Sequence, residues 1–179
     1  MKKFIKVYDN IISPKLADNL EDLLLGQSIP WNYIQNITHS NSTTNYLPGF
    51  SYYFVNKNIN LYENSCFNIS QILYNLTYKL NINLLDIIQA RVFLQIPSLK
   101  SSPNEVHVDL EFPHWVCLYY VCDSDGDTIL FDNSGNEIKR VSPKKGRIVF
   151  FDGSIKHCSS SPSKTHRAVV NFDFIGKKL

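Results

Sequence analysis

Apolar residues in the first half of the chain recur at two spacings, which predict two helices among short strands. Ser13-Pro14 is typical of a helix start, because serine caps the first turn and proline fits the first helical position. A helix is therefore predicted over 14–25, and its apolar face is formed by Leu16, Leu20, Leu23 and Leu24. A second helix is predicted from about 64 to 80, and strands are predicted over 4–8 and 50–55.

The second half of the chain changes to alternating apolar and polar positions. Short strands are predicted over 86–96, 106–110, 114–121, 127–131, 136–141, 147–151 and 166–175, with turn clusters between them. Strands of this length and spacing favour an all-β sandwich or barrel. The chain is thus expected to be mainly β with N-terminal helices (α+β). We expect a single domain over 1–179, in which 1–83 form helical support and 84–179 form the β core.

The stretch from Trp31 to Pro48 has no apolar period and is rich in asparagine, serine and threonine, so it is predicted to be a loop. A loop of this length in a compact domain is either functional or loosely ordered. It is equally compatible with a lid over a site and with a simple connection.

Composition narrows the class of protein. Hydrophobic residues make up 44% of the chain and the net charge is +2, which indicates a globular fold. The chain has no basic stripe and no apolar run of about 20 residues, so neither nucleic acid nor a membrane is an expected partner. Its four cysteines include no C-x-x-C pair, which favours reduced thiols in a cytoplasmic protein.

Two histidines and an aspartate form a candidate metal site. His107 and Asp109 stand two positions apart in a predicted strand, so their side chains are expected to project from the same face. His157 follows another predicted strand and is the natural third ligand. Two histidines and one carboxylate on one face of an octahedral ion leave three positions open, as in non-haem Fe(II) oxygenases. A structural zinc site is closed and usually rich in cysteine.

A His-x-Asp pair alone is weak support for a metal site, because any surface strand can carry one by chance. The remaining histidines, His39, His114 and His166, make no better trio with Asp109. The alternative interpretation of the three candidate ligands is that they are incidental.

Arg167 is a candidate anion-binding residue. It lies in a predicted strand, where its alternating neighbours Val169 and Asn171 share its face. A guanidinium that points into a barrel needs an anionic partner, and no acidic residue nearby in the sequence supplies one. The carboxylate of a small ligand fits this requirement through two parallel hydrogen bonds. The alternative is an arginine exposed at a strand end.

These residues occur in an order that resembles a known family. His107-x-Asp109 is followed by Tyr119-Tyr120 and then by Gly126-Asp127-Thr128-x-x-Phe131. Pro143-x-x-Gly146-x-x-x-Phe150-x-Asp152-Gly153 comes next, and His157 and Arg167 complete the series. This order is similar to that of the 2-oxoglutarate/Fe(II)-dependent dioxygenases, most of all their prolyl-4-hydroxylase-like branch. The resemblance covers about residues 86–175 and extends to no motif of the N-terminal third.

The resemblance implies a double-stranded β-helix (jelly-roll) core with helices packed on one sheet. It implies that His107, Asp109 and His157 hold Fe(II), and that 2-oxoglutarate chelates the iron and pairs its far carboxylate with Arg167. Tyr120 matches a tyrosine that often assists there, and strand alternation allows only one of Tyr119 and Tyr120 to reach inward. The implied reaction consumes O₂ and converts 2-oxoglutarate to succinate and CO₂, with ascorbate as a possible support.

The substrate is not specified by these residues. Trp31, in the polar loop, and Arg91 are candidate substrate-contacting residues; Arg91 either binds a substrate anion or pairs with Glu63, Glu105 or another acid. Peptidyl proline, a small metabolite and other substrates all stay open, because a fold-level analogy does not fix a substrate. Two other functions also stay open: a cupin-like metalloprotein that does not use 2-oxoglutarate, and a non-catalytic β-sandwich binding or accessory protein.

Overall fold

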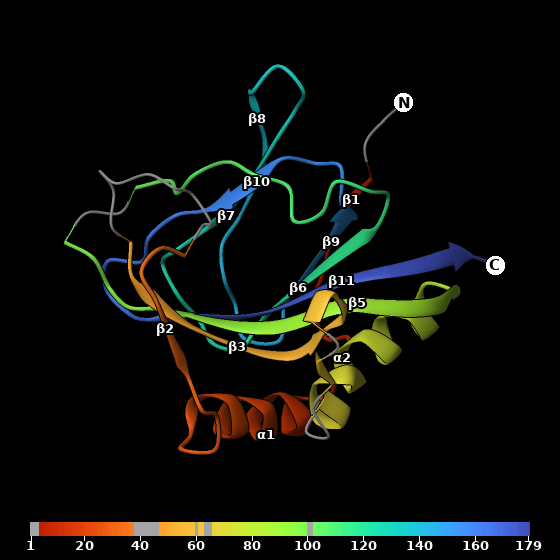
Figure 1. The fold of residues 1–179 in the computed structure, drawn as a ribbon, viewed down its shortest axis with the longest axis horizontal. Coiled ribbons are helices and arrows are strands. Elements are labelled where there is room, and N and C mark those ends of the chain that lie inside the picture. Colours follow the sequence, from red (N-terminus) through yellow and green to blue (C-terminus); the bar gives the residue numbers. More distant parts are fainter. Residues whose placement is uncertain (1–3, 38–46, 60, 63–65, 100–101) are drawn as a thin grey trace.

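Two antiparallel β-sheets and two helices make up the described part of the chain (Figure 1). This computed structural model describes residues 4–37, 47–59, 61–62, 66–99 and 102–179. The helices are α1 (Pro14–Leu25) and α2 (Cys66–Lys79), and η1 (Lys57–Ile59) is a short 3-10 turn. The strands are β1 (Ile5–Tyr8), β2 (Asn32–Ile34), β3 (Gly49–Asn56), β4 (Leu61–Tyr62), β5 (Ile82–Gln95), β6 (Trp115–Tyr120), β7 (Thr128–Phe131), β8 (Glu137–Val141), β9 (Ile148–Asp152), β10 (His157–Ser159) and β11 (Arg167–Lys178).

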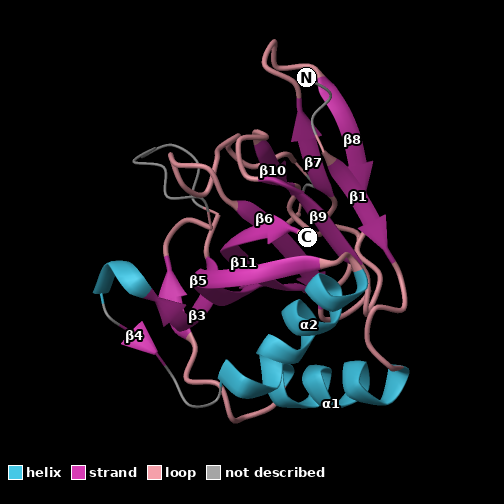
Figure 2. Cartoon of the chain, turned by 90° about the vertical axis from the view of Figure 1, so that its right-hand side faces the viewer, coloured by secondary structure: helices cyan, strands magenta, loops and turns pink. Residues whose placement is uncertain are grey.

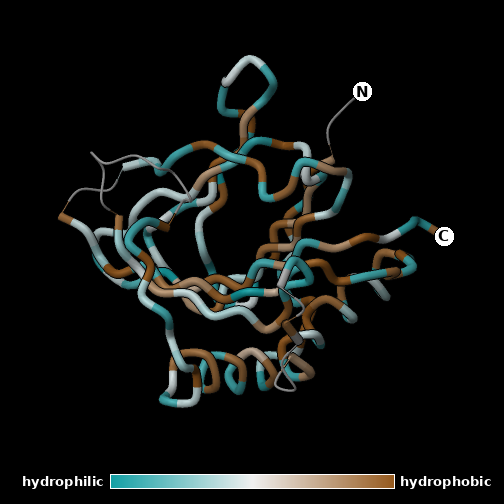
Figure 3. The backbone as a smooth tube through the Cα atoms, viewed as in Figure 1, coloured by the Kyte–Doolittle hydropathy of each residue, from teal (hydrophilic) through white to brown (hydrophobic). Residues whose placement is uncertain are grey.

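The large sheet has the strand order β1-β9-β6-β11-β5-β3-β2. Strand β4 pairs with the C-terminal end of β3, at Val55 and Asn56. The small sheet has the order β10-β7-β8. Both helices lie on one side of the large sheet, and the small sheet lies on the other side (Figures 1 and 2). The hairpin of β7 and β8 projects from the body of the molecule and is largely hydrophilic at its tip (Figure 3).

Helix α1 forms where the sequence predicts it. The Ser13 hydroxyl accepts a hydrogen bond of 3.2 Å from the Leu16 amide, and Pro14 occupies the first helical position. Ala17, Leu20 and Leu24 recur at helical spacing and are buried against the large sheet. No helix in the described part of the chain is long and apolar enough to cross a membrane.

Strand alternation divides the apolar residues between two cores. Along β6, Cys117 and Tyr119 belong to the main core under the helices, whereas Leu118 and Tyr120 belong to a smaller core between the sheets. Strand β11 follows the same rule, because Ala168, Val170, Phe172 and Phe174 all face the main core. Its opposite face is therefore free to carry polar residues toward the small sheet.

Most elements predicted from the pattern are confirmed. Both helices and the strands over 4–8, 50–55, 86–96, 114–121, 127–131, 136–141, 147–151 and 166–175 occur within a few residues of their predicted bounds. Three short strands, β2, β4 and β10, were not predicted, and β2 falls within the predicted loop 31–48. The part of that loop over 38–46 lies outside the described residues.

The predicted strand over 106–110 is wrong. Within this segment only His107 forms a β-bridge, and its partner is His157. The residues on either side of His107 in this segment form no β-bridge. The segment is therefore an irregular connection that touches the small sheet at one point.

The helix–sheet core gives a stability prediction. Leu24→Ala removes a completely buried side chain, and we expect it to lower the free energy of unfolding by about 2–5 kcal/mol. Leu99→Ala makes the same chemical change at a fully exposed position, and we expect an effect of no more than about 0.5 kcal/mol. Urea denaturation followed by circular dichroism measures both. Equal losses in the two variants contradict the assignment of Leu24 to the core.

Candidate functional site

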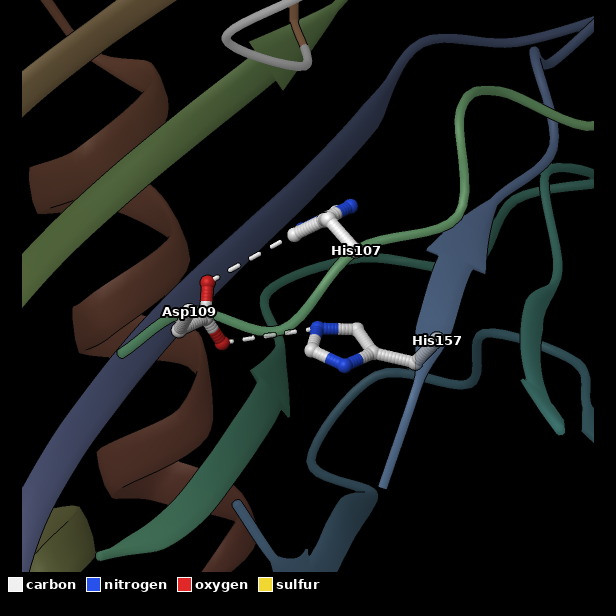
Figure 4. Close-up of side chains that lie close together, drawn as sticks. All are labelled: His107, Asp109 and His157. Atoms are coloured by element: carbon white, nitrogen blue, oxygen red, sulfur yellow. Dashed lines mark ion pairs between the residues drawn. The ribbon is translucent and has the colours of Figure 1, made fainter. Parts of the chain in front are cut away.

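Three side chains from two segments meet between the sheets. His107 and Asp109 lie in the irregular connection between β5 and β6, and His157 is the first residue of β10 (Figure 4). The backbones of His107 and His157 exchange two hydrogen bonds, of 3.0 Å and 2.9 Å. One possible ligand atom from each of the three residues lies within 4.8 Å of the other two, which is close enough for one ion to contact all three. The predicted trio is thus brought together.

Hydrogen bonds to backbone carbonyls orient the imidazole rings of His107 and His157. Nδ1 of His107 lies 3.0 Å from the Glu105 carbonyl oxygen, and Nδ1 of His157 lies 3.2 Å from the Ile155 carbonyl oxygen. Nδ1 therefore carries a proton and donates a hydrogen bond to the carbonyl oxygen, and in the neutral ring Nε2 is left with its lone pair. The two Nε2 atoms point toward the Asp109 carboxylate, at 3.9 Å and 3.4 Å from its oxygens. This arrangement is typical of histidines that bind a metal.

The protonation states suit a cation. Burial lowers the pKa of His107, and the neighbouring His157 lowers it further, so the neutral, metal-binding form is favoured. Burial on its own raises the pKa of the Asp109 carboxyl, but His157 in its protonated form and the Arg91 guanidinium outweigh it and hold that pKa well below its ordinary value. Asp109 Oδ2 is buried and accepts no hydrogen bond from the described residues. A buried carboxylate oxygen in this situation is a natural ligand for an ion.

The three residues open onto a cavity of about 450 Å³ between the two sheets. The large sheet contributes lining side chains from β3, β5, β6 and β11, and the small sheet contributes lining side chains from β7 and β10. A volume of this size is sufficient for a small organic ligand. The cavity wall also includes Arg167, so the predicted anion-binding residue and the candidate metal ligands share one chamber.

Arg167 is buried without an acidic partner. Its Nε donates to the Gly126 carbonyl oxygen at 2.8 Å, Nη1 donates to Gln95 Oε1 at 3.2 Å, and Nη2 donates to Thr128 Oγ1 at 2.9 Å. All three acceptors are neutral, and no carboxylate in the described part of the chain pairs with this guanidinium. Burial accordingly lowers the pKa of Arg167. The negative charge that would balance this guanidinium is one that an anionic ligand group in the cavity could provide.

Tyr120 lies on the Arg167 side of β6, as the alternation predicted, and Tyr119 faces the main core. The Tyr120 hydroxyl donates to Thr128 Oγ1 at 2.7 Å, and the guanidinium of Arg167 lies 5.7 Å from the centre of the tyrosine ring. Tyr120 stands behind Thr128 and is not among the residues that line the cavity. It therefore supports the Arg167 and Thr128 side chains in this structure.

The two candidate substrate residues have different surroundings. Arg91 lines the cavity, and its Nη2 is 2.9 Å from Asp109 Oδ1, so its charge is paired with the acid of the candidate metal site. Trp31 packs against the main core and is not among the lining residues. Glu63, one of the acids considered for Arg91, lies outside the described residues, and Glu105 lines the cavity separately.

A buried polar group beneath the site was not predicted. His114 and Asp173 are both buried, with His114 Nε2 3.8 Å from Asp173 Oδ1. Burial raises the pKa of Asp173, and the nearby Asp109 carboxylate raises it further. Alternation from Arg167 through Asn171 to Asp173 was the available signal, because all three occupy the polar face of β11. The burial of His114 had no such signal, because it depends on the close approach of Gly153 to its ring.

No family model matches the sequence, and no curated protein matches it. Solved structures do match. An oxidoreductase of the 2-oxoglutarate–Fe(II) oxygenase family from Burkholderia pseudomallei has a TM-score of 0.73 and 8% identity, over 95% of this chain and 84% of that one. A prolyl hydroxylase from Trichoplax adhaerens, in complex with a peptide fragment of hypoxia inducible factor, has a TM-score of 0.68 and 15% identity, over 95% and 83% of the two chains.

A third similar structure is a non-haem, α-ketoglutarate-dependent epimerase from nogalamycin biosynthesis. It has a TM-score of 0.64 and 13% identity, over 97% of this chain and 78% of that one. At these identities the shared property is the fold. The chain has the fold of 2-oxoglutarate–Fe(II) oxygenases, among them a prolyl hydroxylase, which confirms the predicted jelly-roll-like class.

The shared acceptor at Thr128 gives a prediction for this side of the cavity. Thr128→Val keeps the volume but removes the oxygen that accepts from both Arg167 and Tyr120, leaving two buried donors without that partner. We expect the free energy of unfolding to fall by about 1–3 kcal/mol. Thr165→Val is the matched control, because Thr165 is exposed, and we expect it to match the wild type. Urea denaturation provides the comparison, and a stable Thr128→Val variant contradicts the importance of the shared acceptor.

Proposed function

We propose that this protein is an Fe(II)- and 2-oxoglutarate-dependent dioxygenase that hydroxylates a substrate C–H bond. The observation that carries this proposal is that the His107–Asp109–His157 cluster and the unpaired guanidinium of Arg167 face one cavity. A redox metal with open positions and a dicarboxylate co-substrate need these two features side by side. A structural metal site needs only the first.

Each residue has a distinct part in the proposed site. His107 and His157 would hold the metal through Nε2, since both Nδ1 atoms are engaged by backbone carbonyls. Asp109 would bind through its unpaired Oδ2, and Arg167 would bind the far carboxylate of 2-oxoglutarate. The bound iron would supply the oxidising chemistry, in which substrate C–H, O₂ and 2-oxoglutarate give the alcohol, succinate and CO₂. Val169 and Leu118 form an apolar part of the chamber wall between the sheets.

We assign the two facing sheets to a double-stranded β-helix. In support of this assignment, the large and small sheets both contribute side chains to the cavity, and all their strand pairs are antiparallel. After the irregular connection the chain alternates between the sheets, with β6, β9 and β11 in the large sheet and β7, β8 and β10 in the small one. The metal site would then lie at one end of the chamber formed by the two sheets.

Several of the side chains that line the cavity carry neutral hydrogen-bonding groups. Tyr53, Asn56 and Asn58 come from β3 and its continuation, and Gln89 comes from β5. We propose an uncharged substrate rich in amide or hydroxyl groups, with a peptide as the first choice because the Trichoplax adhaerens protein holds one. We also propose a cytoplasmic location, which the four free, buried cysteines support.

Uncoupled turnover tests the class of reaction. Wild-type protein with Fe(II), ascorbate, O₂ and 2-oxoglutarate is expected to release succinate, and prolyl peptides are expected to accelerate that release. His107→Ala is the control, because it removes one proposed metal ligand. Succinate at the same rate from both proteins shows that the product does not come from this site. The same assay with other uncharged substrates separates hydroxylation from a different outcome such as epimerisation.

Metal and co-substrate binding provide a prediction that needs no turnover. Changing His107, Asp109 or His157 to alanine is expected to abolish the thermal stabilisation by Mn(II), while the apo proteins remain folded by circular dichroism. Retained stabilisation in any one variant removes that residue from the proposed ligand set. If the wild type binds neither Mn(II) nor 2-oxoglutarate, the protein is a binding module rather than an enzyme of this class.

Two tyrosine variants test which face of β6 contributes to 2-oxoglutarate binding. Tyr120→Phe removes the donor to Thr128 and is expected to weaken 2-oxoglutarate binding modestly in the presence of Mn(II). Tyr119→Phe changes the opposite face of the strand and is expected to leave that affinity unchanged. Arg167→Ala, measured in the same titration, is expected to lose 2-oxoglutarate binding. Unchanged affinity in Arg167→Ala favours a cupin-like metalloprotein that does not use 2-oxoglutarate.

A further inference from the structure

Arg91 is a charged side chain of the cavity wall that several contacts hold in place. It projects from β5, which lies between β3 and β11 inside the large sheet. Its Nη1 donates to the Tyr53 hydroxyl at 3.0 Å, and its guanidinium stacks over the Phe93 ring at 4.5 Å from the ring centre. These two contacts hold the guanidinium in place independently of Asp109. Its third contact, from Nη2 to Asp109 Oδ1 at 2.9 Å, therefore joins a fixed group to the candidate metal site.

Asp109, in contrast, has little backbone support of its own. It lies in the irregular connection, whose isolated β-bridges are at Pro103 and His107 and do not include Asp109. Its side chain is only 2% exposed, so the carboxylate must be held by what surrounds it. Arg91 donates a hydrogen bond of 2.9 Å to this carboxylate, and His157 and Asp173 also lie against it.

The two oxygens of Asp109 consequently have different surroundings. Oδ1 accepts the Arg91 hydrogen bond, whereas Oδ2 is buried, accepts no hydrogen bond from the described residues and lies 3.4 Å from His157 Nε2. A carboxylate that is free to turn can offer a cation either one oxygen or both. The Arg91 contact restricts that turning and leaves Oδ2 as the available atom.

We propose that Arg91 is a positioning residue that makes Asp109 bind the metal through a single oxygen, Oδ2. The inference rests on the proposed function and adds that the orientation of Asp109 sets how many metal positions stay open. Two histidines and one oxygen leave three positions of an octahedral ion open, whereas two histidines and two oxygens leave only two. A chelating co-substrate would take two positions, so a third would stay open only while Oδ1 is held by Arg91.

This role also removes Arg91 as a candidate anion site for the substrate. Its charge is compensated by Asp109, with side chains only 7% and 2% exposed, so little net charge is left for a substrate anion. Arg167 is different, because all its partners are neutral. The cavity therefore contains one arginine for an anionic ligand and one for orienting a carboxylate.

The test is a Mn(II) titration of the metal-free full chain, comparing the wild type with Arg91→Lys. The substitution keeps the positive charge, but a single ammonium group cannot contact Tyr53, stack on Phe93 and hold Asp109 together. We expect the Mn(II) affinity to fall about tenfold or more, as is usual when a group that orients a metal ligand is lost. Arg140→Lys is the matched control, because this arginine is partly exposed on β8 and pairs with Glu137, and we expect wild-type affinity.

Three outcomes are distinguishable. Wild-type Mn(II) affinity in a folded Arg91→Lys variant overturns the positioning role and leaves the proposed function intact. A lower melting temperature of the metal-free variant with unchanged Mn(II) affinity means that Arg91 is merely structural, which also overturns it. No Mn(II) binding by the wild type overturns both the inference and the proposed function.

A crystal structure of the wild type with Mn(II) gives an answer that does not depend on the variant folding. We expect Asp109 Oδ2 on the metal and Oδ1 still within hydrogen-bond distance of Arg91. Coordination through Oδ1, or through both oxygens with Arg91 displaced, contradicts the inference.

Discussion

The pair of backbone hydrogen bonds between His107 and His157 is the contact on which the candidate site depends. It attaches an irregular connection to the first residue of β10 and so places two imidazoles with ring centres 4.7 Å apart. The carbonyl oxygens of Glu105 and Ile155 then orient both rings. Because the backbone holds both Nδ1 atoms, the two Nε2 atoms can face the same point beside the Asp109 carboxylate.

Strand β11 connects the stability of the fold with the chemistry of the cavity. One of its faces packs Ala168, Val170, Phe172 and Phe174 into the main core, while the other carries Arg167, Asn171 and Asp173. The period-two alternation of a strand is what allows one element to serve both purposes. Its central position, between β6 and β5, fixes the register of the polar face against Arg91 and Leu118.

The two buried arginines of the cavity differ in whether an acidic residue balances their charge. Arg91 has an acidic partner, and that partner is a candidate metal ligand. Arg167 has only neutral acceptors, so it retains an unbalanced charge that an anionic ligand can balance. Arg167 could be singled out in the sequence because no nearby acid accompanied it. The pairing of Arg91 with Asp109 joins residues 18 positions apart, which no local pattern reveals.

The sequence by itself determined the elements whose signal is local. Helix α1 follows from Ser13, Pro14 and the leucine spacing, and the face of Tyr120 follows from alternation along β6. The trio His107, Asp109 and His157 was found from residue type and order. Tertiary structure alone decided that 106–110 is not a strand, that β10 is one, and that His114 is buried beside Asp173. The physical reason is that a short strand exists only where a partner supplies hydrogen bonds, and a polar side chain is buried only where distant segments close around it.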